Sequence, residues 1–348
     1  MKIVLDAMGG DIGLFVNLEG ALLASRYFSE TDTIILTGVK SEIEKHIKDK
    51  RMSFGCKIEI VDATDNVGMG DSPTKALQEK PESSIAKGLD LVKSKYADAF
   101  FSPGNTGVIL AFSLTKLGRL RGVNRPALGT VFPIGKHPLI LDIGATPDAK
   151  PENLYQFALL GHEYMKIMKN MEKPVVGLLS IGEENSKGSV VYQKAFELIK
   201  QDKVINFLGN IEGDDFFKNK ADVIVTDGFT GNIVLKFGEG MVHWLKENLK
   251  TSVKPLPLAI LGVILSIPGI LGIPFFLFSI KKLLKKISYD EIGGAPLLGV
   301  DGVVLIGHGK SNPNAVKSGI LNAKKLVEHN FLGELKNIFE KRSGNETD

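Results

Sequence analysis

The chain has a single cysteine, Cys56, among 348 residues. One thiol excludes an internal disulfide framework and a cysteine-rich metal site, so we expect a reducing compartment, the cytoplasm. The chain also lacks an excess of either charge, with 43 basic and 40 acidic residues and a net charge of +3. That balance disfavours a nucleic-acid-binding protein, because such a protein must neutralise many phosphates.

Several catalytic signatures are missing as well. The chain has no HExxH, GxSxG or Walker pattern, and no GxGxxG follows its first predicted strand. Metal-dependent hydrolysis, serine acyl-enzyme chemistry and use of a nucleoside triphosphate are therefore disfavoured, and we expect no metal and no other cofactor. Residues 2–5 enter a strand without a charged and then apolar leader, so no signal peptide is predicted.

The chain does contain a regular alternation of short apolar runs and amphipathic stretches. Strands are predicted at 3–6, 33–37, 57–61, 97–101, 128–132, 139–143, 175–179, 205–208, 223–225 and 303–306. With helices between them, this pattern predicts an α/β fold with a doubly wound, largely parallel sheet, built as one unit or as two lobes around a cleft. Function in such folds lies at the carboxyl ends of the strands.

The junction at residues 97–107 carries the first functional signal. An apolar strand ends there in a glycine-bearing loop, and an amphipathic helix follows. The unpaired N–H groups and the positive dipole end of such a helix favour an anion such as phosphate. Gly104 and Gly107 would allow close approach of the backbone, and Asn105 and Thr106 would add donors. The alternative is that Asn105 and Thr106 only cap the helix.

Glycines paired with polar residues also follow four other predicted strands, and together such loops favour a binding site over simple turns. The predicted substrate-binding and phosphate-binding residues of these loops are Asp6, Gly9, Gly10, Asp11, Glu183, Asp227 and Gly231. Their carboxylates could also be interpreted as a metal cluster. Because carboxylates repel phosphate and these lack ligand spacing, we favour hydrogen-bonding and loop-fixing roles.

Three residues are candidates for catalysis. Lys187 lies between a predicted strand and a helix, where it could meet phosphate as a point charge; a solvated loop lysine is the alternative. His308 is the only histidine placed at the carboxyl end of a strand, although a core or capping role would also fit. Asn232 closes the loop that follows the strand at 223–225.

Residues 255–280 carry no charge and are followed by a lysine-rich stretch at 281–286. Four prolines and three glycines interrupt the segment, so it predicts a hairpin at the membrane interface better than a spanning helix. We assign residues 251–287 to this arm, and residues 1–250 and 288–348 to the catalytic body. The residues predicted to meet an anionic membrane surface are Leu261, Ile264, Ile267, Ile270, Phe275, Phe276, Lys281 and Lys282. The alternative is an arm packed against a second subunit.

The order of these motifs resembles the bacterial phosphate acyltransferase family PlsX. The resemblance covers residues 2–325 and rests on motifs at 6–11, 104–107, 125–127, 150–152, 181–184, 187–188, 209–213, 227–232 and 293–299. The motif at 209–213 adds Asn210 to the predicted binding residues. The chain departs from the family at Ile12-Gly13-Leu14, where His-Ala-Pro is usual, and at Ala145 and Ala149, where Asn and Cys are usual.

The resemblance implies a fold similar to phosphotransacetylase and isocitrate-dehydrogenase-like enzymes, and a homodimer. It implies transfer of a long-chain fatty acyl group from acyl carrier protein to inorganic phosphate. The acyl phosphate would serve phospholipid synthesis, with a glycerol-3-phosphate acyltransferase downstream, at the inner face of the cell membrane.

The residues agree with this chemistry, since phosphate attack on a thioester needs positioned charge and oxyanion donors but no nucleophilic side chain. Two alternatives stay open: a short-chain phosphotransacetylase-like enzyme acting on acetyl-coenzyme A, and a non-catalytic acyl-binding or lipid-binding protein.

Overall fold

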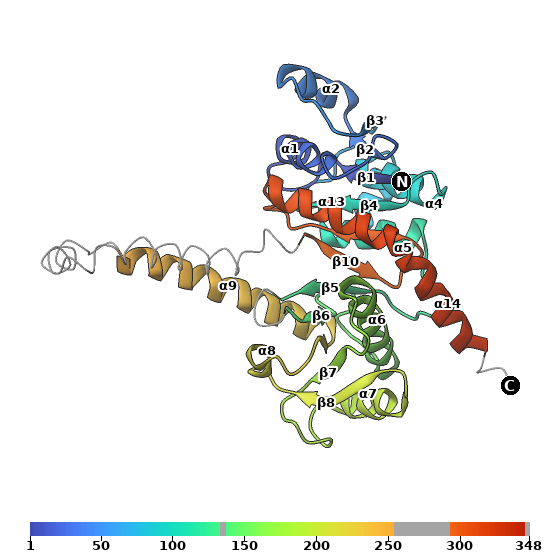
Figure 1. The fold of residues 1–348 in the computed structure, drawn as a ribbon, viewed down its shortest axis with the longest axis vertical. Helices are drawn as coiled ribbons and strands as arrows, with labels where there is room; N and C mark the ends of the chain where they lie inside the picture. The colour runs from blue at the N-terminus through green and yellow to red at the C-terminus, as the bar shows by residue number, and fades with distance from the viewer. Residues whose placement is uncertain (133–136, 254–292, 345–348) are drawn as a thin grey trace, which may run out of the picture.

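The computed structural model describes residues 1–132, 137–253 and 293–344. One sheet runs the length of the molecule (Figure 1). Its strands lie in the order β3 (Lys57–Asp62), β2 (Thr33–Gly38), β1 (Lys2–Asp6), β4 (Ala99–Ser102), β11 (Val303–Ile306), β10 (Ala295–Leu298), β5 (Ala127–Val131), β6 (Leu139–Leu141), β9 (Val223–Val225), β7 (Val175–Leu179) and β8 (Asn206–Ile211).

Most neighbouring strands are parallel, as predicted. Among the described strands, only the pairs β11–β10, β10–β5 and β5–β6 are antiparallel. These three reversals lie at the centre of the sheet and divide it into a first half, β3 to β11, and a second half, β6 to β8. Because three reversals separate them, the strands of the second half run opposite to those of the first.

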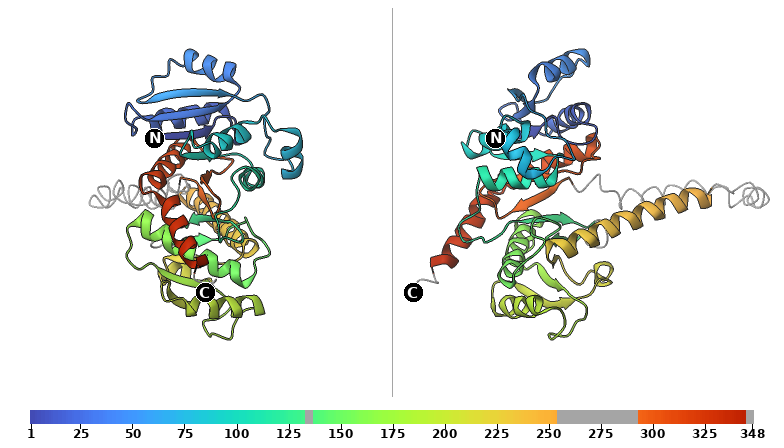
Figure 2. Two further views of the ribbon diagram at one scale, coloured as in Figure 1. Left: turned by 90° about the vertical axis from the view of Figure 1, so that its right-hand side faces the viewer. Right: turned by 180° about the vertical axis from the view of Figure 1, so that it is seen from behind.

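Helices cover both faces of the sheet, as a doubly wound fold requires (Figure 2). Within β1, the side chains of Ile3 and Leu5 pack into one hydrophobic cluster and that of Val4 packs into the other, which is the two-residue period of a strand. The first cluster is completed by α1 (Leu14–Ser25), α2 (Lys40–Asp49), α6 (Pro151–Lys169), α7 (Val190–Gln201), α13 (Pro313–Glu328) and α14 (Phe331–Gly344). The second is completed by α3 (Pro73–Glu79), α4 (Ser84–Lys93), α5 (Thr106–Lys116), α8 (Asp215–Lys218) and α9 (Gly228–Val253).

Several helix starts follow from local chemistry. The side chain of Asn105 accepts a hydrogen bond from the N–H of Val108 and caps α5, and Asn312 caps α13 in the same way. Proline occupies the first turn of α6, where its missing N–H leaves no bond unmade. Three of the described elements were not predicted. These are α3, which buries only Ala76, α8, which has only four residues, and β10, where Pro296 obscures the strand pattern.

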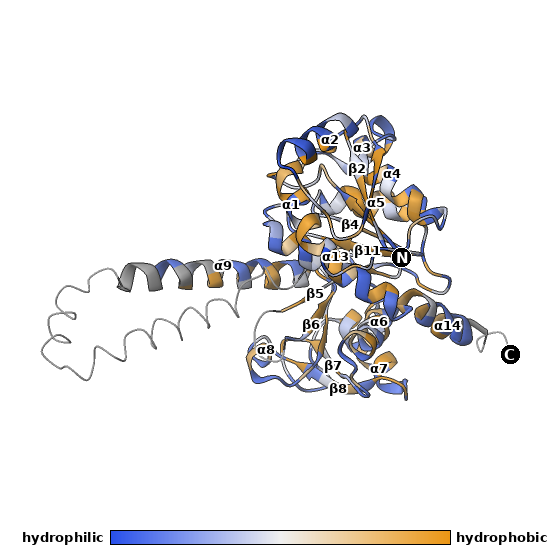
Figure 3. Ribbon diagram, turned by 45° about the horizontal axis from the view of Figure 1, so that its top comes forward, coloured by the Kyte–Doolittle hydropathy of each residue, from blue (hydrophilic) through white to orange (hydrophobic). Residues whose placement is uncertain are grey.

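Helix α9 extends away from the rest of the molecule (Figures 1 and 2). It begins at Gly228, and its first turn holds two glycines and a threonine. Its exposed face carries large apolar side chains spaced three or four residues apart: Phe229, Ile233, Phe237, Met241 and Trp244. We call this set the α9 stripe. The strands β5 and β6, which lie beside the base of α9, are by contrast apolar and buried (Figure 3).

The predicted arm falls largely on residues 254–292. All eight predicted membrane residues, Leu261, Ile264, Ile267, Ile270, Phe275, Phe276, Lys281 and Lys282, therefore lie outside the described residues. Among the helices that are described, none combines the length and the hydropathy that crossing a bilayer requires.

Candidate active site

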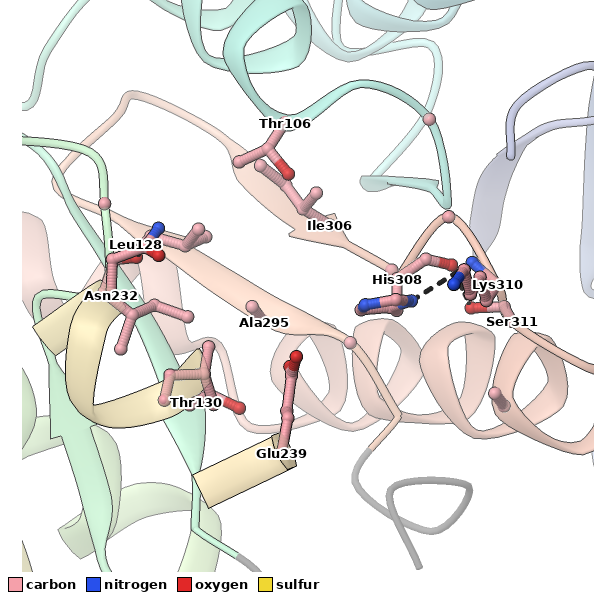
Figure 4. Close-up of a pocket in the computed structure, with 18 of the residues that line it drawn as sticks. Thr106, Leu128, Thr130, Asn232, Glu239, Ala295, Ile306, His308, Lys310 and Ser311 are labelled. Carbon is pink, nitrogen blue, oxygen red and sulfur yellow. Dashed lines mark hydrogen bonds between the residues drawn. The ribbon is translucent and has the colours of Figure 1, made fainter. Parts of the chain in front are cut away.

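A cavity of about 550 Å³ lies where the two halves of the sheet meet. The first half contributes the loops after β1, β4 and β11, and the second contributes the loop after β6 and the first turns of α9 (Figure 4). Its polar and charged lining side chains are Asp11, Thr106, Thr130, Asn232, Lys236, Glu239, His308, Lys310 and Ser311.

Asp6 supports the first-half loops from below. Its fully buried carboxylate accepts hydrogen bonds from the N–H groups of Met8, at 3.0 Å, and Gly9, at 3.2 Å, and from the Ser102 hydroxyl, at 2.6 Å. Burial raises the pKa of Asp6, while these hydrogen bonds act in the opposite direction. A side chain at position 9 would come within 2.6 Å of the carboxylate, so glycine is required there. Asp6 therefore fixes the shape of the loop that carries Asp11.

Asp142 has the same role in the second half. Its buried carboxylate accepts four backbone N–H groups, from Leu128, Gly144, Ala145 and Thr146, at 2.6 to 3.1 Å. Burial raises its pKa, again against the hydrogen bonds. This network holds Gly144 at the cavity wall.

Only two of the four residues in the loop at 104–107 line the cavity as predicted. The Asn105 amide is used within the protein, since it donates to the carbonyl oxygens of Met69 and Asp71 at 2.8 and 3.0 Å and caps α5. Gly107 packs against Pro73. Gly104 and Thr106, in contrast, line the cavity, so the N-terminus of α5 opens into it.

The lining of the cavity is mixed in polarity. Leu128, Ile143, Leu235 and Ile306 contribute apolar side chains to it. On α9, Lys236 and Glu239 line the same cavity and pair with each other at 2.9 Å. One turn earlier, Asn232 donates to the carbonyl oxygen of Ile143 at 3.2 Å, which ties α9 to the loop after β6.

The loop after β11 is tightly held. The carbonyl oxygen of His308 accepts hydrogen bonds from the N–H of Ser311, at 2.9 Å, and from its hydroxyl, at 2.6 Å. The N–H of Lys310 donates to Nδ1 of the His308 ring at 3.1 Å (Figure 4). Asp11 N–H donates to the carbonyl oxygen of Gly309 at 2.7 Å, which joins this loop to the one after β1.

The structure thus brings part of the predicted site together. Five predicted residues line the cavity: Asp11, Gly104, Thr106, Asn232 and His308. Asp6, Gly9 and Gly10 lie directly beneath or beside them. The others are not among the lining residues: Asn105, Gly107, Glu183, Lys187, Asn210, Asp227 and Gly231.

The strand order explains why the loop with Lys187 is separate. This loop follows β7, which is two strands further from the centre than β6. There Glu183 pairs with Lys220, and Asn210 donates to the carbonyl oxygen of Glu184 at 2.8 Å. Glu183 and Asn210 line a different groove, and Lys187 is exposed beside them. A catalytic role for Lys187 stays a prediction.

Asp227 and Gly231 organise the start of α9. Asp227 accepts hydrogen bonds from the N–H and the hydroxyl of Thr230, both at 2.8 Å, and from the hydroxyl of Tyr192. Gly231 lies so close to Asp142 that a Cβ would be 1.9 Å from its carbonyl oxygen. Both residues place Asn232 at the cavity wall.

Sequence reasoning missed Lys310, Lys236 and Glu239. The signal for Lys310 was its position two residues after His308, at the same strand end. Lys236 and Glu239 lie within a helix, where charges are usually read as a solvated face. Among the described residues, no group of three or more His, Cys, Asp or Glu side chains is placed to hold a metal ion.

Comparison with known proteins gives a consistent result. A family model described as "fatty acid synthesis protein" matches residues 1–333. The phosphate acyltransferase of Halothermothrix orenii is 42% identical, over 98% of this chain and 99% of that protein. The phosphate acyltransferase of Dictyoglomus turgidum is 43% identical, over 94% of each chain.

Solved structures share the fold at low identity. A phosphotransacetylase from Streptococcus pyogenes aligns with a TM-score of 0.60 and 16% identity, over 94% of each chain. The EutD phosphotransacetylase from Staphylococcus aureus aligns with a TM-score of 0.58 and 16% identity, also over 94% of each chain. These likenesses confirm the predicted fold class.

Proposed function

The chain belongs to the fatty acid synthesis protein family and is a phosphate acyltransferase, and from this premise we propose that it moves a long-chain fatty acyl group from acyl carrier protein to inorganic phosphate. The acyl phosphate formed would serve phospholipid synthesis, with a glycerol-3-phosphate acyltransferase as the next enzyme.

The observation that carries this proposal is the mixed lining of the cavity. The N-terminus of α5 with Gly104 and Thr106 opens into it, where backbone N–H groups and the helix dipole favour a phosphate. Leu128, Leu235 and Ile306 line the same cavity with apolar side chains, which suit an acyl chain. A cavity of about 550 Å³ has room for the reacting ends of both substrates.

The reaction requires the two substrates to be aligned. Phosphate held at α5 would attack the thioester carbonyl carbon, the carbonyl oxygen would become an oxyanion, and the thiolate would leave. Lys310 is the lining lysine on the first-half loops and would offset phosphate charge. Asn232 faces the same space from α9 and would orient the thioester.

The α9 stripe supports a second copy of this chain as a partner. Its side chains are exposed by 47% to 69%, and they form one apolar face along a helix that extends from the body. Two such helices packed antiparallel would cover both stripes in a symmetric dimer. The sequence of the adjoining arm supports peripheral binding to anionic membrane at the inner face, with lysine charge assisting the apolar segment.

The direct test is to incubate the protein with phosphate and a C16 acyl-acyl carrier protein, and to detect acyl phosphate by mass spectrometry. Acetyl-coenzyme A with phosphate is the matched comparison. Acyl phosphate from the long-chain donor alone supports the proposal. Product from acetyl-coenzyme A alone would indicate a short-chain phosphotransacetylase, and no product from either donor would indicate a binding protein.

A further inference from the structure

We propose that His308 works as a neutral hydrogen-bond donor to the thioester oxygen, fixed in that form by the backbone N–H of Lys310, and not as a general acid. The inference rests on the proposed function, because it assigns a role in acyl transfer to one side chain of the same cavity.

The ring contact decides the tautomer. The N–H of Lys310 points at Nδ1 of His308 at 3.1 Å, so Nδ1 is the acceptor and carries no proton. An imidazolium has a proton on both nitrogens and would set two donors against each other at this contact. The ring is therefore neutral while the contact is kept, and its single proton is on Nε2.

The position of Nε2 makes this proton useful. In Figure 4 the ring reaches from its loop into the cavity, with the Lys310 contact on one side and the other nitrogen on the open side. The two hydrogen bonds from Ser311 to the His308 carbonyl oxygen fix the backbone from which the ring extends. A donor held by the loop in this way needs little rearrangement when an oxyanion forms.

The charged side chains that line the cavity with His308 are Asp11 from the β1 loop, Lys310 from its own loop, and Lys236 and Glu239 from α9. The last two pair with each other. A neutral histidine that polarises a carbonyl has precedent in enzyme chemistry.

Proton balance agrees with this role. Monohydrogen phosphate attacks through one oxygen, the new C–O bond forms, and the C–S bond breaks with its electron pair on sulfur. The proton lost by phosphate equals the one gained by the thiol, so no protein acid has to be consumed. A neutral ring that gave up its Nε2 proton would become an imidazolate, which is unfavourable near neutral pH. Donation of a hydrogen bond requires no such loss.

Three variants and one spectrum test the inference. In His308→Ala we expect kcat to fall by about 10²–10³ with the KM for phosphate little changed, the usual cost of one oxyanion donor. His308→Gln puts an amide N–H near the position of Nε2, so it should recover at least about tenfold over alanine, whereas His308→Asn should not. Nitrogen-15 NMR of labelled histidine should show Nε2 protonated and Nδ1 free at neutral pH. Thermal unfolding of each variant controls for folding.

A thioester with an aromatic thiol separates the two roles. Such a thiol leaves without protonation, so this donor would restore His308→Ala to wild-type rate if His308 were a general acid. We expect the deficit to persist. Restoration, a protonated Nδ1, or equal kcat in the alanine and glutamine variants would each overturn the inference. If the wild-type protein forms no acyl phosphate, the proposed function fails, while the NMR result still reports on the tautomer.

Discussion

The two halves of the sheet hold their cavity loops in place with different hydrogen-bond donors. Each buries an aspartate under the loops that face the cavity, and each packs glycines against it. Around Asp6 the network includes hydroxyls, from Ser102 and Ser84, besides two N–H groups. Around Asp142 it consists of four backbone N–H groups alone.

The two networks differ in how well they can adapt to a change of the aspartate side chain. A hydroxyl can donate or accept, so the first-half network can adjust when its carboxylate changes. A backbone N–H can only donate. The side chain at position 142 must therefore present a hydrogen-bond acceptor to each of the four N–H groups around it. The second half also anchors α9, which carries Asn232 to the cavity. We therefore expect mutations in the second half to lower the free energy of unfolding more than comparable mutations in the first half.

Gly231→Ala should have the largest effect. Its Cβ would lie 1.9 Å from the carbonyl oxygen of Asp142, so the start of α9 has to move. We expect a loss of more than about 4 kcal/mol in the free energy of unfolding, together with loss of activity. Gly240→Ala on the same helix is the matched control, because nothing lies within 4 Å of its Cβ. Urea denaturation measures both, and similar stabilities would contradict the expected rigidity.

Lys187→Ala tests whether the loop after β7 also takes part in the active site, in addition to α9 and the loop after β6. If Lys187 positions phosphate, kcat should fall by about 10²–10³ while the fold is unchanged. Lys194→Ala, an exposed lysine on α7, is the control. Steady-state assays with varied phosphate make the measurement, and full turnover in Lys187→Ala would remove it from the site.

Asp142→Asn and Asp6→Asn compare the two networks directly. An asparagine at 142 must turn its amide nitrogen toward at least one buried N–H group, so we expect a loss of about 1–3 kcal/mol in unfolding free energy. At position 6 the amide nitrogen can face Ser102, which can accept, so the loss should be smaller. Denaturation midpoints at neutral pH measure both losses. Equal losses would mean that the hydroxyls around Asp6 do not help its network to accommodate an asparagine.

Alkaline pH should weaken the second half through Tyr192. Burial and the hydrogen bond with Asp227 raise the pKa of Tyr192 to about 12, from about 10 when unfolded. The folded state holds this proton more tightly, so the stability is present below pH 10 and is lost as pH rises through 12. We expect the unfolding free energy of the wild-type protein to fall by about 2 kcal/mol more than that of Tyr192→Phe between pH 10 and 12. Parallel curves for the two proteins would contradict this assignment.

Much of the fold was predictable because its signals are local. The apolar runs of β1, β4 and β7 and the proline at the start of α6 each indicate an element without its neighbours. The reversals at β10 and β5 could not be read, since strand direction depends on partners distant in sequence.

The candidate site divides in the same way. Gly104, Thr106 and His308 follow strands of the first half and were found from that position alone. Lys236 and Glu239 reach the cavity only because α9 crosses to it, which no local pattern reports. Asn105 was predicted to bind substrate but does not line the cavity. Capping and anion binding favour the same residue type, and in the structure its side chain is a helix cap.

The order of strands also determines when each strand can find its partner during translation. β11 and β10 join the two halves at the centre of the sheet, yet they come from residues 295–306, near the end of the chain. On the ribosome, β4 must wait for β11, which pairs with it 204 residues later, and β5 must wait for β10, which pairs with it 169 residues later. Contacts of such long range slow folding. Until then both strands have open edges, which are the usual starting points of aggregation. A ribosome that stalls before residue 295 would therefore release two unjoined half-sheets, each exposing the edge that the other half was meant to protect.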